Sequence, residues 1–246
     1  MPDAKGLQAR ATSRLLAETT ARHRFRSGAP QVALTFDDGP DVEHTPQVMS
    51  ALAEHGATAT FFVLLTRARR SPGLLAELRA AGHEVALHGP DHRPLSAFGA
   101  RETRSRLNDA RIELEDLVQA PISHYRPPYG LLTLAAARAV RSEGLRTLLW
   151  NRDFQDWIDV AEHERLRAAT EGVRAGDVLL AHDGHAGESD GAADGIAPDV
   201  DRAGLVRSVL RRLQERGLAA RSARSFDRRP AGRRRVEWGA GPISFR

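Results

Sequence analysis

Two adjacent aspartates, Asp37 and Asp38, close an apolar run that ends at Phe36, and Gly39 and Pro40 follow them directly. Consecutive side chains of a strand point to opposite faces, so both carboxylates can serve one site only at or beyond the end of the strand. Glycine and proline are turn residues and mark that end. A solvated turn would carry the same residues, so the meaning of the pair depends on the rest of the chain.

Other reactive side chains also follow apolar runs that we predict to be strands. His88 and His92 follow one run, Arg126 ends a second, Asp156 follows a third, and His182 follows a fourth. Because parallel strands end on one rim of a barrel, we expect these groups to meet on that rim. The clusters expected there are Asp37-Asp38, residues 88–92, residues 126–130, residues 153–157 and residues 180–182.

Two histidines and an aspartate form the donor set of a catalytic zinc site. His88 and His92 are four residues apart and can approach one ion in a helix or in a tight loop, and one of the two aspartates would complete the set. Such an ion acts as a Lewis acid, which lowers the pKa of a water and polarises a carbonyl group. The sequence therefore predicts a divalent metal site, with zinc as the expected metal.

The remaining groups suit proton transfer around that site. The aspartate of the pair that does not bind the ion can take a proton from water, and Arg126 would keep it ionised. His182 can protonate a leaving amine, provided that a carboxylate such as Asp156 orients the imidazole and raises its pKa. Together these groups predict metal-assisted hydrolysis of an amide. The sequence has no glycine-rich phosphate loop and no nucleophile-elbow serine, which argues against phosphoryl transfer and acyl-enzyme chemistry.

Strands and amphipathic helices alternate along the chain. We predict strands at residues 32–36, 59–64, 84–87, 122–126, 145–150, 177–181 and 218–221, with helices between most of them. Thr45 is expected to cap the first of these helices, with Pro46 at its first position. The pattern predicts an α/β fold, a distorted (β/α) barrel with about seven parallel strands, and an open doubly wound sheet is the alternative.

The composition bounds the class of protein. With 246 residues, 41% of them hydrophobic, the chain is long enough for one large domain. It has no apolar stretch long enough to span a membrane and no secretory signal at its start, so we expect a cytoplasmic protein. It also has no cysteine, so a transition-metal site must use histidine and carboxylate ligands.

The charge pattern argues against nucleic acid as a partner, because the net charge of +4 arises from basic residues that are scattered among 32 acids. We expect a polar lead-in at residues 1–28 that is helical over residues 7–22, a barrel domain at residues 29–222, and an arginine-rich tail at residues 223–246. We expect that tail to be disordered or to lie at an edge of the fold. Binding of an anionic polymer or lipid to the tail is the alternative. Residues 183–201 form a long loop rich in glycine and aspartate, which suggests a functional role.

Over residues 31–217 the chain resembles the polysaccharide deacetylases of carbohydrate esterase family 4, the NodB homology group. The five clusters occur in the order of the five family motifs, beginning with Thr35-Phe36-Asp37-Asp38-Gly39-Pro40. The resemblance implies a NodB-like barrel and removal of the acetyl group from an N-acetylated amino sugar or polysaccharide. It implies Asp37 as general base, Asp38, His88 and His92 as ligands of a zinc ion, Arg126 as the partner of the base, Tyr129 as an oxyanion donor through its backbone N–H, His182 as general acid tuned by Asp156, and Trp157 and Leu180 as walls of the acetyl pocket.

Two positions depart from the family pattern. Gly89 stands where the second motif usually has serine or threonine, and Leu65 stands where a glycine often follows the Ala59-Thr60-Phe61-Phe62 strand. Neither change removes a proposed ligand or acid. A hydrolase of a small cyclic amide or ureide that uses the same site is the first alternative, and a carbohydrate-binding protein without catalysis is the second.

Overall fold

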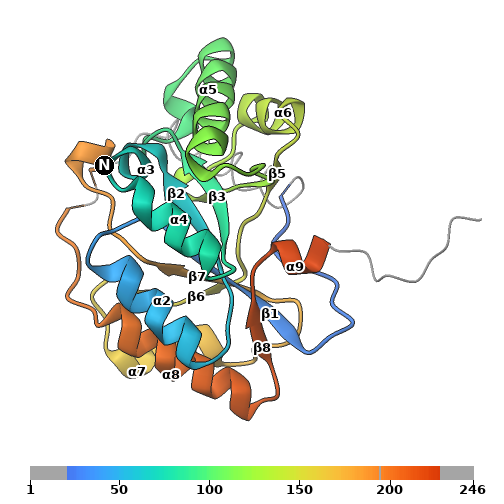
Figure 1. The fold of residues 1–246 in the computed structure, drawn as a ribbon, viewed down its shortest axis with the longest axis vertical. Helices are drawn as coiled ribbons and strands as arrows, with labels where there is room; N and C mark the ends of the chain where they lie inside the picture. The colour runs from blue at the N-terminus through green and yellow to red at the C-terminus, as the bar shows by residue number, and fades with distance from the viewer. Residues whose placement is uncertain (1–20, 194, 228–246) are drawn as a thin grey trace, which may run out of the picture.

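One parallel sheet organises the fold, and a computed structural model describes it over residues 21–193 and 195–227 (Figure 1). Its strands follow the order β5-β4-β3-β2-β1-β7-β6, and β8 pairs with the first half of β1. All seven ladders are parallel. The strands are β1 (Gln31–Asp37), β2 (Thr60–Leu64), β3 (Glu84–Gly89), β4 (His124–Tyr125), β5 (Arg146–Thr147), β6 (Arg152–Asp153), β7 (Val178–His182) and β8 (Ala219–Arg221).

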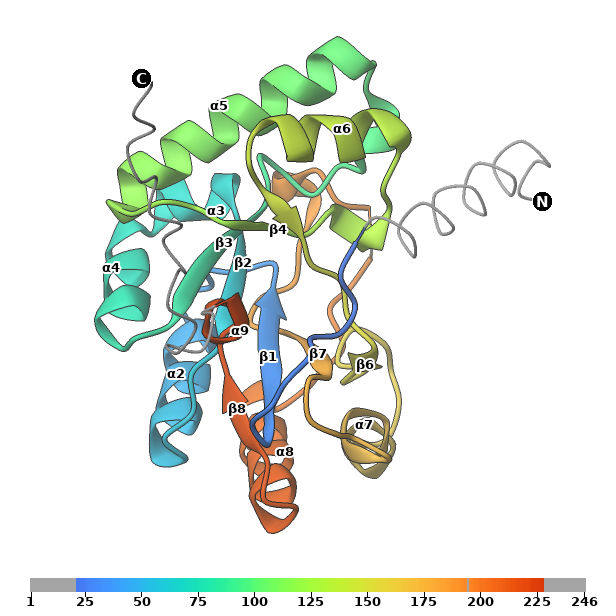
Figure 2. The ribbon, with the colours of Figure 1, turned by 90° about the vertical axis from the view of Figure 1, so that its right-hand side faces the viewer.

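Helices surround the strands (Figure 2). The neighbours α2 and α8, α7 and α8, and α5 and α6 pack side by side. In the part of the chain that the structure describes, no helix combines the length and the apolar character needed to cross a membrane. The helices are α2 (His44–Glu54), α3 (Leu65–Arg70), α4 (Pro72–Ala80), α5 (Ala100–Val118), α6 (Leu134–Ser142), α7 (Glu162–Thr170), α8 (Arg202–Glu215) and α9 (Arg224–Asp227), with short 3-10 turns η1 (Leu95–Ala97), η2 (Pro128–Gly130) and η3 (Glu188–Asp190).

The central strands are buried on both faces, as strands of a covered parallel sheet are. Side chains on one face of the sheet join the large core under the helices, and those on the other face form a smaller core inside the barrel. The smaller core includes Ala33, Phe62 and Val178. Residues two apart in a strand share a face, so Thr35 and Asp37 continue the Ala33 face of β1 to the rim.

The predicted distorted barrel of about seven parallel strands is confirmed, with differences in detail. The predicted strands at 122–126 and 145–150 are only two residues long, and β6 is an additional two-residue strand. Helix α3 was also not predicted and follows β2 without a linker. The prediction that Thr45 caps α2 was wrong, because the helix begins at His44 and the Thr45 hydroxyl donates to Asp183 instead, at 2.5 Å.

The barrel has a seam between the edge strands β5 and β6, which no ladder joins in the described residues. Residues 22–25 lie across this seam before the chain enters β1 (Figure 2). The backbone of Arg22 forms an isolated β-bridge with Leu148, beside β5. The backbone of Arg24 forms another with Asp177, just before β7. The end of the predicted lead-in therefore covers the seam. Residues 1–20 of that lead-in, which include most of its predicted helix, lie outside the described residues, as does the arginine cluster of Arg228, Arg229 and residues 233–235.

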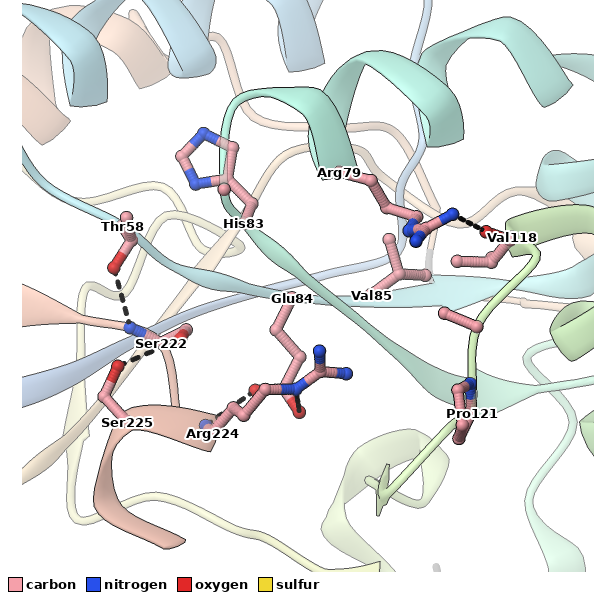
Figure 3. Close-up of a pocket in the computed structure, with 12 residues that line it drawn as sticks. Thr58, Arg79, His83, Glu84, Val85, Val118, Pro121, Ser222, Arg224 and Ser225 are labelled. Atoms are coloured by element: carbon pink, nitrogen blue, oxygen red, sulfur yellow. Dashed lines mark hydrogen bonds and ion pairs between the residues drawn. The ribbon is translucent and has the colours of Figure 1, made fainter. Parts of the chain in front are cut away.

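The strands begin at the end of the barrel opposite the rim where Asp37 lies. At this end α9 and a polar cluster cover the inner core. There the N–H of Ser222 donates to the Thr58 hydroxyl, and the N–H of Arg224 donates to the buried Glu84 carboxylate (Figure 3). A cavity of about 400 Å³ opens beside these groups. None of the predicted site residues lines it.

Candidate active site

The two adjacent aspartates lie where β1 ends. Asp37 is the last residue of the strand and lies in register with His182, the last residue of β7. Asp38 has a φ of 72°, in the left-handed region, so the chain turns sharply at this residue. The turn ends the alternation of side chains between the two faces of the strand. The charges of both carboxylates therefore act on His182 and raise its pKa. The structure thus brings together three groups that the sequence places on two different strand ends.

Asp38, His88 and His92 converge on one point, as predicted for a metal site. Each offers a ligand atom, and these atoms lie within 4.8 Å of one another. Asp38 Oδ1 is 3.4 Å from Nε2 of His88 and 3.3 Å from Nε2 of His92. All three residues are buried. His88 is the second-last residue of strand β3, whereas His92 lies in the loop that follows the strand.

This cluster fits a divalent cation. The buried Oδ1 of Asp38 has no hydrogen-bond partner within the described ranges. Nδ1 of His88 lies 2.8 Å from the backbone oxygen of Arg126, which requires the proton on Nδ1 and leaves the lone pair of Nε2 facing Asp38. Burial opposes ionisation of Asp38, but its interactions with His88, His182 and His92 outweigh the burial and lower the pKa of the carboxyl. The chain therefore presents an ionised carboxylate and at least one oriented imidazole, which is a donor set that zinc accepts.

Asp37 is held by Arg126 rather than by the histidines. Arg126 Nη1 donates to Asp37 Oδ1 at 2.6 Å and lies 2.9 Å from the Thr35 hydroxyl oxygen. The guanidinium is fully buried inside the barrel, where it stacks over Phe62 and donates from Nε to the backbone oxygen of Leu148. A fully buried guanidinium needs such a set of acceptors, and one of them is the carboxylate. The pair therefore fixes the position of Asp37 beside the metal cluster.

His182 is paired with Asp156. Nδ1 of the imidazole lies 2.7 Å from Asp156 Oδ1, and the His182 backbone N–H donates to Oδ2 of the same carboxylate at 2.8 Å. Burial disfavours the charged imidazole, but the charge and hydrogen bond of Asp156, together with the charges of Asp38 and Asp37, raise the pKa of His182 to about 9. His182 is therefore positioned to hold a proton at neutral pH, with Nε2 as the atom that remains to face the site.

The remaining predicted residues surround these groups. The Tyr129 ring packs edge-on against His92 and is 43% exposed, and Tyr129 has a φ of 58° within η2. Trp157 is 51% exposed, and its indole N–H lies 3.3 Å from both oxygens of Asp153. Asp153 therefore positions the tryptophan, whereas Asp156 contacts the histidine. Leu180 is buried in β7 on the same side of the strand as His182, two residues away.

Sequence reasoning missed several residues that support the site. Arg202, the first residue of α8, donates to Asp156 Oδ2 and to the His182 carbonyl, both at 3.2 Å. Asp183 is buried behind the turn, and burial together with the charge of Asp38 raises its pKa to about 7. A Cβ at Gly39 would lie 2.2 Å from Asp183 Oδ2, so only glycine fits there. In the sequence, only the position of Asp183 next to His182 could have indicated that one of these residues supports the site.

The departure at Gly89 has a steric reason. A Cβ at this position would lie 2.7 Å from the backbone oxygen of Asp91, which is closer than real Cβ contacts. Serine or threonine would therefore not fit this loop conformation without a backbone shift. The loop that carries His92 is held by other contacts, among them a hydrogen bond of 2.7 Å from the His92 N–H to the Asp190 carbonyl.

The fold and the site define a class of barrel hydrolase, and comparison with known proteins defines it further. The family model described as polysaccharide deacetylase matches residues 26–148. A chitooligosaccharide deacetylase of Sinorhizobium fredii is 36% identical over 200 residues, which are 81% of this chain and 93% of the relative. The chain belongs to the polysaccharide deacetylase family. It is a hydrolase of carbon–nitrogen bonds other than peptide bonds, as the five motifs implied.

Two further comparisons support the assignment. A peptidoglycan-N-acetylglucosamine deacetylase of Bacillus cereus is 32% identical over 155 residues, covering 62% of this chain and 72% of the relative. A crystal structure of a peptidoglycan N-acetylglucosamine deacetylase superposes with a TM-score of 0.75 at 24% identity, over 87% of this chain and 96% of that one. The second comparison confirms the fold alone.

Proposed function

We propose that this protein is a metal-dependent deacetylase that removes the acetyl group from N-acetylated amino sugars of an oligosaccharide or polysaccharide. The observation that carries the proposal is the meeting of three units on one rim: the cluster of Asp38, His88 and His92, the Asp37–Arg126 pair, and the His182–Asp156 pair. A hydrolase of an amide needs an electrophile, a base and an acid around one bond, and these units supply them.

Asp38, His88 and His92 would hold a divalent cation, with zinc as the expected metal. When bound, it supplies Lewis acidity, which lowers the pKa of water and polarises the acetyl carbonyl. Asp37 is the proposed general base. Arg126 fixes one oxygen of this carboxylate by a hydrogen bond, so the other can accept the proton of the attacking water.

His182 is the proposed general acid. Its raised pKa keeps the imidazole protonated near neutral pH, and Asp156 holds Nδ1 so that Nε2 can donate a proton to the departing amine. This proton converts the poor amide leaving group into a neutral amine. Without it the carbon–nitrogen bond would have to break with charge on nitrogen.

The substrate assignment rests on the walls of the site and on the relatives. Leu180 and Trp157 are proposed to enclose the methyl group of the acetyl, and the backbone N–H of Tyr129 to stabilise the oxyanion. The two exposed aromatic rings at the rim, Tyr129 and Trp157, offer flat apolar surfaces of the kind on which sugar rings stack. Chitooligosaccharide and peptidoglycan, the substrates that the names of the relatives carry, are the proposed substrate classes.

Acetate release paired with metal analysis tests the proposal. The purified protein should bind one equivalent of divalent metal and release acetate from N-acetylglucosamine oligomers, and a chelator should abolish the release until zinc is added back. The panel should include N-acetylglucosamine itself, peptidoglycan and a hydantoin. Turnover of the hydantoin alone would favour a cyclic-amide hydrolase, and the absence of both metal binding and acetate release would exclude the proposal.

The Asp37→Asn variant separates the base from the ligands. Asparagine keeps the shape of the side chain but cannot take a proton, so turnover should fall about a hundredfold or more while zinc is retained. The Asp38→Asn variant should instead lose zinc affinity. Full activity of Asp37→Asn would contradict the assignment of the base.

A further inference from the structure

We propose that Arg67, with Arg70 and Asp190, forms an arginine clamp that positions two of the three metal ligands, Asp38 and His92, from outside the site. The inference deepens the proposed function, because it rests on the metal site proposed above. Arg67 is a positioning residue in this account, since it acts through the two loops that carry the ligands. The experiment therefore measures metal affinity directly and does not depend on turnover.

The location of α3 gives Arg67 access to both loops. Strand β2 lies between β1 and β3 in the sheet, and α3 begins directly after the last residue of β2. Asp38 follows β1, and His92 follows β3. A side chain at the start of α3 is therefore at the rim between the two ligand-bearing segments. Leu65, the departure from the family pattern, is the first residue of this helix and is buried in the main core.

The Arg67 guanidinium joins α3 to two other segments, the loop after β7 and the turn after β1. Its Nε donates to Asp190 Oδ2 at 2.9 Å, and its Nη2 donates to the carbonyl of His185 at 2.5 Å, both in the loop after β7. Its Nη1 lies 3.6 Å from Asp41 Oδ2, in the turn that follows Asp38. The Arg67 side chain is only 13% exposed. Such a partly buried, multidentate arginine holds its partners more rigidly than a surface ion pair does.

Asp190 connects Arg67 to His92. Its carboxylate is buried and also accepts from the Thr66 hydroxyl at 2.9 Å and from Arg70. Its backbone carbonyl accepts the N–H of His92 at 2.7 Å. The same segment of the rim has a second tie, because the Thr66 N–H donates to the carbonyl of Pro90 at 3.2 Å. The position of the His92 backbone therefore depends on where the clamp holds Asp190.

Arg67 is also connected to Asp38, through His185 and Ala186 in the loop after β7. The N–H of Ala186 lies 3.3 Å from Asp38 Oδ2, and Ala186 follows His185, whose carbonyl accepts from Arg67. This contact satisfies Oδ2 and leaves Oδ1 for the two histidines. A Cβ at Gly184 would lie 2.6 Å from Arg67 Nη1 and 3.0 Å from the Asp38 carbonyl, so the loop, the arginine and the ligand are in close contact.

The test compares zinc affinity in matched variants. In Arg67→Met the apolar stem is kept and the guanidinium is lost, and in Asp190→Asn the shape of the side chain is kept and its charge is lost. Either change should lower the affinity for zinc about tenfold or more, the range found for residues that orient metal ligands from outside. Affinity is measured on the metal-free full chain by competition with a fluorescent chelator. Cobalt-loaded variants should show an altered visible spectrum because the ligands are displaced.

Arg69→Met is the matched control. Arg69 lies on the same helix, but its side chain is 55% exposed and pairs with Glu113 on the surface. This variant should keep the zinc affinity of the wild type within about twofold, as expected when a surface ion pair is removed. It therefore controls for loss of one positive charge near the site.

The outcomes separate this inference from the proposed function. A role limited to stability would lower the melting temperature of Arg67→Met without changing zinc affinity or the cobalt spectrum at low temperature, and that result would overturn the inference. Unchanged affinity in Asp190→Asn would overturn it too, including in the case that Arg67→Met does not fold. If the wild type itself binds no zinc, the proposed metal site fails first.

Discussion

Asp156 controls the proton on His182 more directly than any other residue of the site. It contacts both Nδ1 and the backbone N–H of the histidine, and Arg202 holds its second oxygen. The carboxylate is buried, and its own pKa is lowered, because the charge of His182, their hydrogen bond and the charge of Arg202 outweigh its burial. The pair therefore behaves as an ionised carboxylate that stabilises an imidazolium.

The Asp156→Asn variant should shift the alkaline limb of the pH profile of kcat/KM to lower pH. His182 has a pKa raised to about 9, so its acid form is present below this value and is lost as pH rises through it. A cation on Asp38 would cancel part of the shift, but the contribution of Asp156 would remain. Without the carboxylate, the imidazole should lose its proton closer to its ordinary pKa, and the rate near neutral pH should fall about tenfold or more.

Asp159→Asn is the control for this experiment, because Asp159 is exposed in the same loop. Its pH profile should match that of the wild type. An unchanged alkaline limb in Asp156→Asn would mean that another group is the acid.

At the scale of elements, α9 is joined to the start of β3 and β4 by a buried charged network. His124 of β4 lies with Nδ1 2.9 Å from Glu84 Oε1 and with Nε2 3.2 Å from Asp227 Oδ2. Arg146 and Arg22 also contact Asp227. Burial opposes charge on His124, but the hydrogen bonds and charges of the two carboxylates raise its pKa.

The His124→Gln variant should destabilise the fold by about 3 kcal/mol, because it removes the nearest cation of the buried Glu84 and one of the three cations around Asp227. The pKa of His124 is raised on folding, so its contribution is complete below the ordinary value of 6.5 and is lost as pH rises through the raised value. The free energy of unfolding, measured by denaturant at about pH 6 and about pH 9, should therefore differ most from that of the wild type at the lower pH. His163→Gln, at an exposed position on α7, is the control.

At the scale of the whole molecule, the barrel is completed by a segment from outside the sheet. Residues 22–25 cover the seam between β5 and β6, and the N–H of Phe25 donates to the Gly176 carbonyl at 2.8 Å. Phe25 then packs in the inner core and stacks on Phe226 of α9. The two ends of the described chain thus meet on the barrel and stabilise the strands that carry the site.

The Gly176→Ala variant should weaken this closure. Gly176 has a φ of 87°, and a Cβ there would lie 2.1 Å from the Phe25 carbonyl oxygen, so the segment would have to move. We expect a loss of about 3 kcal/mol in the free energy of unfolding. Gly82→Ala is the matched control, with a φ of 82° and no atom near the added methyl, and it should cost about 1 kcal/mol. Equal losses in the two variants would show that the seam contact contributes nothing.

The sequence alone predicted the parallel barrel and the side chains that meet on its rim. Local chemistry carries that information: strands alternate with amphipathic helices, and in a parallel sheet whatever follows each strand reaches the same rim. Asp37, Asp38, His88, Arg126 and His182 could therefore be placed near one another without coordinates. The family resemblance also implied Asp156 as the partner of His182, and the structure brings these two side chains to 2.7 Å, whereas Asp153 contacts Trp157.

Only the tertiary structure decided what supports those side chains. The links of Arg67 to Asp190, Thr45 to Asp183, and Arg202 to Asp156 join residues that are 123, 138 and 46 positions apart. Neither periodicity nor turn chemistry specifies such pairs, because they depend on which loops the closed sheet brings into contact. Short motifs in the sequence therefore specify the reactive side chains. Their positions depend on long-range packing of the loops around them.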